Sequence, residues 1–211
     1  MQSLVPTPAG DARISYAPAA GTARAVLALG HGAGGGIEAR DLRALAEALP
    51  PLGITVALVE QPWRVAGKKV APAPRTLDTG WVPVAERLRE EGLPLVVGGR
   101  SAGARVACRT GAATGAVGVL ALAFPLHPPG RPERSRAAEL LESGLPTLVV
   151  QGAADPFGGP QEFPELPGSH ELVALPYGGH GFDVPKRASM GQAEVLELIT
   201  GAVGRWVLAL L

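Results

Sequence analysis

The sequence predicts an α/β protein built on a mostly parallel sheet of about six to seven strands, with helices on both faces. Two observations carry this prediction: short apolar runs recur without helical periodicity, and segments with helical spacing lie between them. Apolar runs of this length that stop at Gly or Pro are typical of strands buried on both faces. Their alternation with helices predicts one open sheet.

Six apolar runs are expected to form the strands, at 25–30, 54–59, 93–99, 116–124, 145–152 and 171–176. Three segments between or after them repeat apolar residues with the period of a helix. The predicted apolar faces are Ile37, Leu42, Leu45, Ala46 and Leu49 in the first, Trp81, Val84, Ala85 and Leu88 in the second, and Leu196, Ile199, Val203, Trp206, Val207 and Leu210 in the third.

Two long irregular loops are expected, at 61–76 and 124–136. Each follows a predicted strand, so each should lie at the carboxyl edge of the sheet, where open α/β folds bind ligands. The first loop carries Trp63, Arg64, Lys68 and Lys69 without any acidic residue. It is either a solvated basic surface or a pocket mouth that attracts an anionic substrate.

Composition bounds the function classes. The 211 residues are 46% hydrophobic, enough for one core, and we expect a single domain over 1–211. A formal net charge of zero gives no reason to expect nucleic acid or an anionic membrane as partner. Cys108 is the only cysteine, which excludes an internal disulfide or a cysteine zinc site. With no signal-peptide pattern and no long apolar span, the expected location is the cytoplasm; the oligomeric state stays open.

The stretch Gly99-Arg100-Ser101-Ala102-Gly103 fits G-x-S-x-G between a predicted strand and a predicted helix. That context is typical of a nucleophile elbow, in which a strained turn lifts the serine hydroxyl above the sheet edge. The alternative is an ordinary strand-to-helix turn, because a chain with 29 glycines can produce the pattern by chance.

A serine nucleophile needs a base and an orienting acid. Among the histidines that follow Ser101, His180 alone lies between the last predicted strand and the C-terminal helix, whereas His127 and His170 are expected at the surface. Asp155 directly follows the strand at 145–152 and is the expected acid. The weaker alternatives are Asp183, a predicted loop cap, and Glu162 and Glu165, which lie farther from the strand end.

The segment 31–36, His-Gly-Ala-Gly-Gly-Gly, follows the first predicted strand and is similar to the oxyanion loop of esterases. Its backbone N–H groups could face a developing oxyanion together with that of Ala102. A phosphate cradle is the alternative, but neither dinucleotide-type glycine spacing nor a G-x-x-x-x-G-K-[ST] motif occurs.

With these motifs the chain resembles the α/β-hydrolase superfamily over roughly residues 24–210. Four pieces, at 30–35, 97–107, 151–158 and 178–182, look like the small dienelactone-hydrolase-like family that includes a subunit of a non-specific-lethal chromatin complex. The resemblance implies Ser101 as nucleophile, Asp155 as acid and His180 as base. It also implies oxyanion donors from Ala33 and Ala102.

The expected function is that of a serine hydrolase acting on a carboxylic ester or thioester, with an amide as the less favoured substrate, and without a metal or an organic cofactor. The substrate is expected to be either small or tethered to something larger. Dienelactone hydrolases proper have cysteine at the elbow, so Ser101 argues against that particular substrate. The loop at 124–136 is too short for a cap domain. The alternative function is a catalytically silent interaction module that keeps the same fold.

Overall fold

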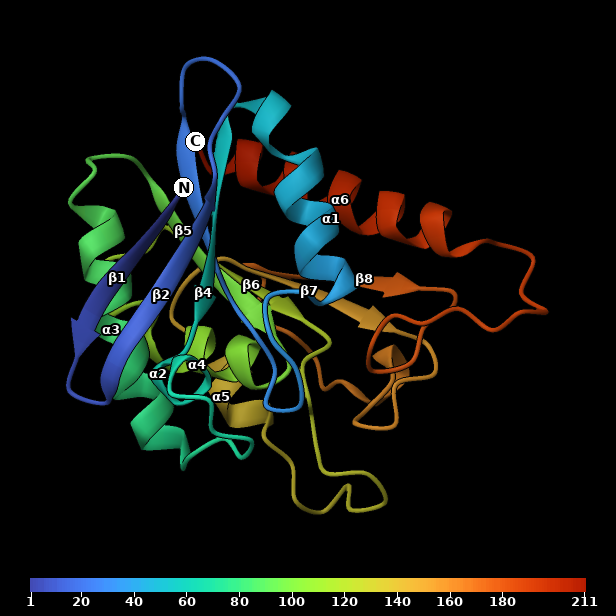
Figure 1. The fold of residues 1–211 in the computed structure, drawn as a ribbon. Helices are drawn as coiled ribbons and strands as arrows, with labels where there is room; N and C mark the ends of the chain where they lie inside the picture. Colours follow the sequence, from blue (N-terminus) through green and yellow to red (C-terminus); the bar gives the residue numbers. More distant parts are fainter.

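The computed structural model describes all 211 residues, and its strands form one eight-stranded sheet (Figure 1). The order across the sheet is β1-β2-β4-β3-β5-β6-β7-β8. From β4 to β8 all neighbours are parallel, whereas β1 and β2 pair antiparallel at one edge. The predicted fold class is therefore confirmed.

The strands are β1 (Gln2–Thr7), β2 (Gly10–Ala17), β3 (Ala25–Gly30), β4 (Ile54–Glu60), β5 (Leu95–Arg100), β6 (Gly118–Leu122), β7 (Thr147–Gly152) and β8 (His170–Leu175). The helices are α1 (Arg40–Ala48), α2 (Pro62–Val65), α3 (Pro74–Arg89), α4 (Ala102–Thr110), α5 (Ala137–Leu141) and α6 (Gln192–Ala209). Single 3₁₀ turns lie at Pro50–Leu52 and Pro160–Glu162. No helix combines the length and apolar character needed to cross a membrane.

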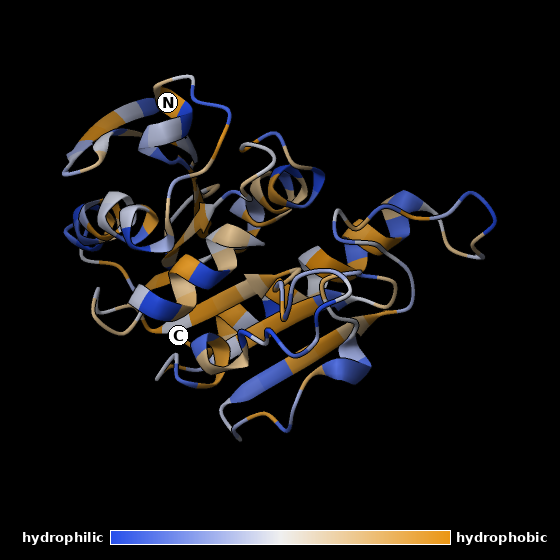
Figure 2. Cartoon of the chain, turned by 90° about the horizontal axis from the view of Figure 1, so that it is seen from below, coloured by the Kyte–Doolittle hydropathy of each residue, from blue (hydrophilic) through white to orange (hydrophobic).

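Alternate side chains of the parallel strands point to opposite faces of the sheet and pack into two separate hydrophobic cores. Val97 and Val119 pack on the side that α3 and α4 cover, while Val96 and Leu120 pack on the side of α1 and α6. Figure 2 shows the central strands as mainly hydrophobic and the covering helices as hydrophilic on their outer sides. A strand buried on both faces needs apolar residues throughout, which is the pattern that the sequence displays.

Two details differ from the prediction. The β1–β2 hairpin was not predicted, because short edge strands exposed on one face lack a continuous apolar run. The segment 61–76 is not one loop, since α2 occupies Pro62–Val65 and α3 begins at Pro74. Proline at the first turn suits a helix start, because its missing N–H would have no partner there. The loop at 124–136 is irregular, as expected, and leads into the short α5.

Candidate active site

Ser101 lies in a strained turn between β5 and α4. Its φ of 52° and ψ of −112° are uncommon for a residue with a side chain, and such conformations cost about 1–3 kcal/mol. The flanking glycines are needed for close approach. A Cβ at Gly103 would lie 2.5 Å from the carbonyl oxygen of Gly30, and one at Gly99 would collide with the same atom. The G-x-S-x-G pattern thus lets α4 pack directly against the end of β3.

Ser101, His180 and Asp155 form one hydrogen-bonded chain. The Asp155 carboxylate can only accept, so His180 donates its Nδ1–H to it, at 2.9 Å from Oδ2 and 3.1 Å from Oδ1. His180 Nε2 then accepts from the Ser101 hydroxyl at 2.8 Å. The three residues follow β5, β7 and β8, so the carboxyl edge of the sheet brings them together. This is the arrangement that a general base needs toward a nucleophile.

Asp155 is buried and fixed from several sides. Gln151 Nε2 donates to its Oδ2 at 3.0 Å, and the backbone N–H of Phe157 donates to its Oδ1 at 2.8 Å. Phe157 also covers the His180 ring, with the ring centroids 4.1 Å apart. The carboxylate therefore has little freedom to rotate away from the imidazole.

The His180 loop is anchored from two directions. Phe182 is fully buried in the α1–α6 core although its φ of 54° is strained. Arg100, beside the serine, donates from one terminal nitrogen to the His180 carbonyl and from Nε to Asp41 at 3.2 Å. Burial raises the pKa of Asp41, and the Arg100 charge opposes that rise. Arg100 is thus held between α1 and the histidine loop.

The segment 31–36 borders the serine on the other side. Neither Ala33 N–H nor Ala102 N–H donates a hydrogen bond within the protein, and both residues line the cleft at Ser101. Amide groups left free beside a nucleophile can receive an oxyanion.

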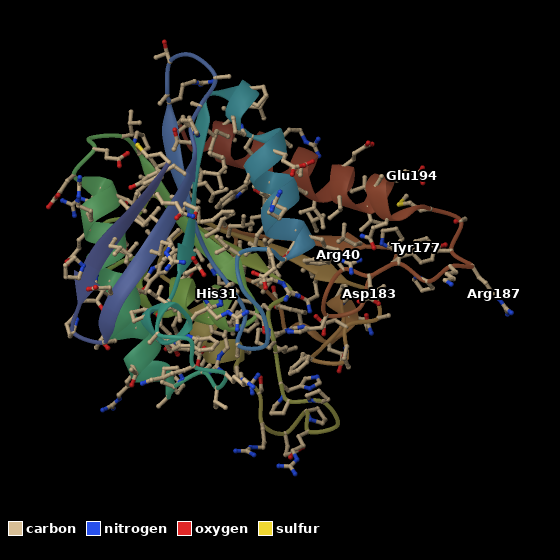
Figure 3. All side chains as sticks on the ribbon, in the orientation of Figure 1. His31, Arg40, Tyr177, Asp183, Arg187 and Glu194 are labelled. Atoms are coloured by element: carbon tan, nitrogen blue, oxygen red, sulfur yellow. The ribbon has the colours of Figure 1, made fainter.

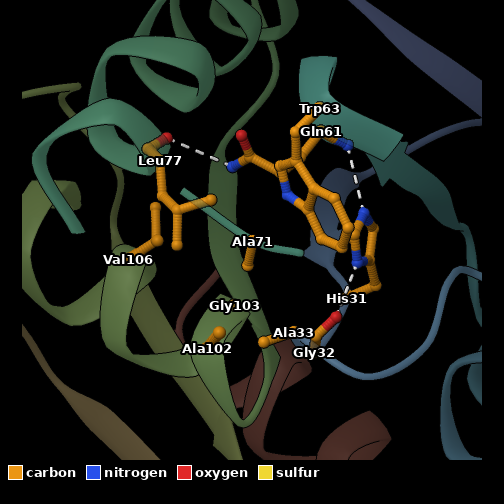
Figure 4. A pocket seen from close by; sticks show the side chains of 10 residues that line it. All are labelled: His31, Gly32, Ala33, Gln61, Trp63, Ala71, Leu77, Ala102, Gly103 and Val106. Atoms are coloured by element: carbon orange, nitrogen blue, oxygen red, sulfur yellow. Dashed lines mark hydrogen bonds between the residues drawn. The ribbon is translucent and has the colours of Figure 1, made fainter. Parts of the chain in front are cut away.

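His31 fixes the start of this segment, as Figure 4 shows. Its Nε2 accepts from the Gln61 N–H at 3.2 Å, so the proton lies on Nδ1, which donates to the Gly32 carbonyl at 2.9 Å. Burial lowers the pKa of His31, which favours this neutral form. Because the C=O and N–H of a trans peptide point in opposite directions, the bond to Gly32 turns the Ala33 N–H away from the His31 ring.

The cleft at Ser101 has a volume of about 500 Å³. Its walls are the residues Gly32, Ala33, Gly34, Gly35, Arg100, Ser101, Ala102, Arg105, Pro125, Arg136, Phe157, His180 and Gly181. Cavities of this size take small organic ligands. No group of three or more His, Cys, Asp or Glu side chains is arranged to hold a metal ion.

The basic residues of 61–76 do not line this cleft. Trp63 is buried against His31 and borders a small pocket that adjoins the cleft behind Ala33 and Ala102 (Figure 4), while Lys68 lines another. Arg64 lies 3.7 Å from Glu38, an exposed pair. The cations that line the cleft are arginines from other elements. The hypothesis that the basic residues of 61–76 form the mouth of the pocket is therefore not supported.

Several alternative residues lie elsewhere. Asp183 is exposed, on the segment between β8 and α6 that continues to Arg187 at the far right of Figure 3. Glu165 is exposed as well. His127 is not at the surface as expected: it is 6% exposed and its Nε2 lies 3.0 Å from Glu162. The two residues join the loops that follow β6 and β7.

A second Ser–His contact lies at the opposite edge of the sheet. His170 Nε2 is 3.2 Å from Ser143 Oγ, but it is also 3.0 Å from the Leu140 carbonyl oxygen. A carbonyl only accepts, so this nitrogen carries a proton and cannot act as a base for Ser143. No carboxylate contacts His170. The pair is a structural link between α5 and the start of β8.

The sheet with a serine at a strand-to-helix elbow defines the fold of an α/β hydrolase. A family model described as an alpha/beta hydrolase domain matches residues 23–208, so the chain belongs to this family. No curated protein sequence matches the chain.

Solved structures agree on the fold. XC6422 from Xanthomonas campestris, an α/β serine hydrolase without a lid, is 23% identical, with 98% of this chain and 94% of that chain covered and a TM-score of 0.74. Dienelactone hydrolase from Anabaena variabilis is 18% identical, with coverages of 99% and 96% and a TM-score of 0.75. Est1E from Butyrivibrio proteoclasticus, bound to ferulic acid, is 15% identical, with 98% of each chain covered and a TM-score of 0.70.

Proposed function

We propose that this protein is a serine hydrolase that cleaves a small carboxylic ester or thioester through an acyl-enzyme. The single observation that carries the proposal is the continuous chain of hydrogen bonds from Ser101 through His180 to Asp155. Its position at the mouth of a cleft supports access by a substrate. The motif resemblance to the small dienelactone-hydrolase-like family and the ferulic acid bound to Est1E favour a small acyl ligand.

In the proposed reaction, Ser101 Oγ attacks the acyl carbon while His180 Nε2 takes the hydroxyl proton. The Asp155 carboxylate keeps Nδ1–H of the imidazole in place and stabilises the imidazolium that forms. The N–H groups of Ala33 and Ala102 bind the oxyanion of the tetrahedral intermediate. One such donor contributes about 2.7–4 kcal/mol to the stability of the transition state.

Collapse of the intermediate expels the alcohol or thiol, which takes the proton from His180. A water molecule then attacks the acyl-enzyme by the same route in reverse, with His180 as base. The acid product leaves and the Ser101 hydroxyl is restored. The sequence of steps needs no metal or organic cofactor.

The test is labelling with a fluorophosphonate probe together with turnover of p-nitrophenyl esters of graded acyl length. Mass spectrometry should locate the adduct on Ser101, and Ser101→Ala should abolish both labelling and turnover. Ser143→Ala is the matched control, because that serine also contacts a histidine but lacks a free base, and it should keep both activities.

Labelling of the Ser101→Ala protein at an unchanged rate would exclude Ser101 as nucleophile. Labelling of the wild type without turnover of any ester or thioester would instead favour the silent interaction module.

A further inference from the structure

The cleft beside Ser101 is lined by three arginines and by no acidic residue. Arg100 comes from the end of β5, Arg105 from α4, and Arg136 from the loop that follows β6. The rest of the wall is largely the backbone of 32–35 with Pro125 and Phe157. The wall of the cleft is therefore positively charged, although the whole chain has a formal net charge of zero.

Two of these arginines already have carboxylate partners. Arg100 contacts the buried Asp41. Arg105 donates two hydrogen bonds to Glu139, from Nε at 2.7 Å and from a terminal nitrogen at 2.6 Å. A guanidinium paired in this two-pronged way is held in place and is largely neutralised.

Arg136 has no carboxylate partner. Its side chain donates one hydrogen bond, to the Pro125 carbonyl oxygen at 3.1 Å. Its backbone N–H donates to the Leu126 carbonyl oxygen at 2.7 Å. Glu139 lies three residues further on, but its two oxygens bind Arg105 and Arg109. The Arg136 guanidinium is therefore fixed at one nitrogen, half-buried, and free to bind at the others.

The surroundings oppose the Arg136 charge. Burial lowers the pKa of Arg136, and the neighbouring charge of Arg105 lowers it further. An arginine nevertheless stays protonated at neutral pH. An anion that enters the cleft would relieve this repulsion and would meet the unused N–H groups of the guanidinium.

We propose that Arg136 binds a carboxylate of the substrate, so that the enzyme acts on acyl compounds carrying a second, anionic end. This proposal rests on the proposed hydrolase function. A carboxylate fits better than a phosphate monoester, because one unpaired guanidinium balances one charge while a phosphate monoester carries about −1.5 to −2 at pH 7. The planar fork of arginine also matches the two oxygens of a carboxylate.

The experiment compares matched anionic and neutral esters. Mono-p-nitrophenyl adipate is compared with p-nitrophenyl hexanoate, which places the charge on the acyl side. The pair p-acetoxybenzoate and methyl p-acetoxybenzoate places the charge on the leaving group. In Arg136→Gln, the ratio of kcat/KM for the anionic ester to that for the neutral ester should fall about tenfold to a hundredfold in one pair.

Arg134→Gln is the matched control, because this exposed arginine lies in the same loop but outside the cleft. It should leave the ratio in both pairs as in the wild type. A mere loosening of the loop would lower both rates together and leave the ratio unchanged. An unchanged ratio in both pairs of Arg136→Gln would overturn the proposal.

A binding measurement separates this proposal from the proposed function. Monomethyl adipate and dimethyl adipate are titrated by calorimetry into Ser101→Ala and into the double variant Ser101→Ala, Arg136→Gln. Selective binding of the monoester that is lost in the double variant supports the carboxylate site, even if the wild type turned over no ester. Equal binding by both proteins, or none by either, contradicts it.

Discussion

Arg100 connects the Ser101 turn to the loop of the proposed base, His180. It occupies the first variable position of G-x-S-x-G, and its guanidinium contacts the His180 carbonyl and the buried Asp41. Asp41 lies in α1 and is 1% exposed, so Arg100 is the only charged partner of its carboxylate and solvent contributes little. Removal of one partner from such a buried pair typically costs about 3–5 kcal/mol of stability.

We expect Arg100→Met to lower both the melting temperature and kcat. The double variant Arg100→Met, Asp41→Asn should regain most of the melting temperature, because no uncompensated charge is then buried. Its kcat should stay about tenfold to a hundredfold low with a nearly unchanged KM, since the His180 carbonyl has lost its anchor. Thermal unfolding and p-nitrophenyl ester kinetics measure the two effects. Recovery of both quantities in the double variant would assign Arg100 a structural role alone.

The sequence predicts Ser101, Asp155 and His180 as a group because each follows a strand that is visible as an apolar run. Arg100 could not be predicted in this way. Its partner Asp41 lies 59 residues away, and only the packing of α1 beside the sheet edge brings the two together. The same holds for Phe157, which sits two residues after Asp155 with no local pattern that points to the His180 ring.

At the scale of elements, the loops after β6 and β7 are joined by His127 and Glu162. The Pro128 carbonyl accepts from His127 Nδ1 at 3.0 Å, and Nε2 lies 3.0 Å from the Glu162 carboxylate. Hydrogen bonds to Pro128 and Glu162 raise the pKa of His127. The Gly159 N–H and then His127 lower the pKa of Glu162. Both shifts favour the ion pair, which fixes the loop that carries Arg136.

The sign of each shift gives the pH range of this stabilisation. Because the pKa of His127 is raised in the folded state, the histidine stabilises the fold at pH values below the ordinary histidine pKa. This stabilisation is lost as the pH rises through the folded-state pKa. Because the pKa of Glu162 is lowered in the folded state, the glutamate stabilises the fold at pH values above the ordinary glutamate pKa. This stabilisation is lost as the pH falls through the folded-state pKa. The pair should therefore stabilise most between about pH 4.3 and about pH 6.5.

We expect the free energy of unfolding to differ most between the wild type and His127→Gln in that range, and to differ less at alkaline pH. Urea unfolding at a series of pH values measures the difference. Glu165→Gln is the control, because this exposed glutamate has no such partner and should not change the profile. A difference that does not vary with pH would argue against an ion pair in solution.

The elements themselves were predictable to different degrees. The strands of the parallel sheet are apolar on both faces, and the sequence displays them as uninterrupted runs. The β1–β2 hairpin has one exposed face, and its pairing with β4 depends on contacts distant in the sequence. Within 61–76, the short α2 was missed because one helical turn has too few residues to display a period.

At the scale of the whole molecule, the sheet separates two cores, and Cys108 reports on one of them. It lies in α4, facing the core that α3 also covers, and is 2% exposed. Burial, with a further contribution from Glu139, raises the pKa of its thiol to about 12. The thiolate is the reactive form of cysteine, so the native protein should be inert toward thiol reagents.

We expect Ellman's reagent to modify Cys108 only when the α3–α4 core opens, because α4 packs centrally against β5 and β6. The reaction should rise with urea in parallel with the change in tryptophan fluorescence, since Trp81 is buried in the same core. Cys108→Ala supplies the reagent blank and should retain ester turnover, as Cys108 does not line the cleft. Fast modification in native buffer would mean that α4, and with it the Ser101 turn, opens locally without unfolding of the sheet.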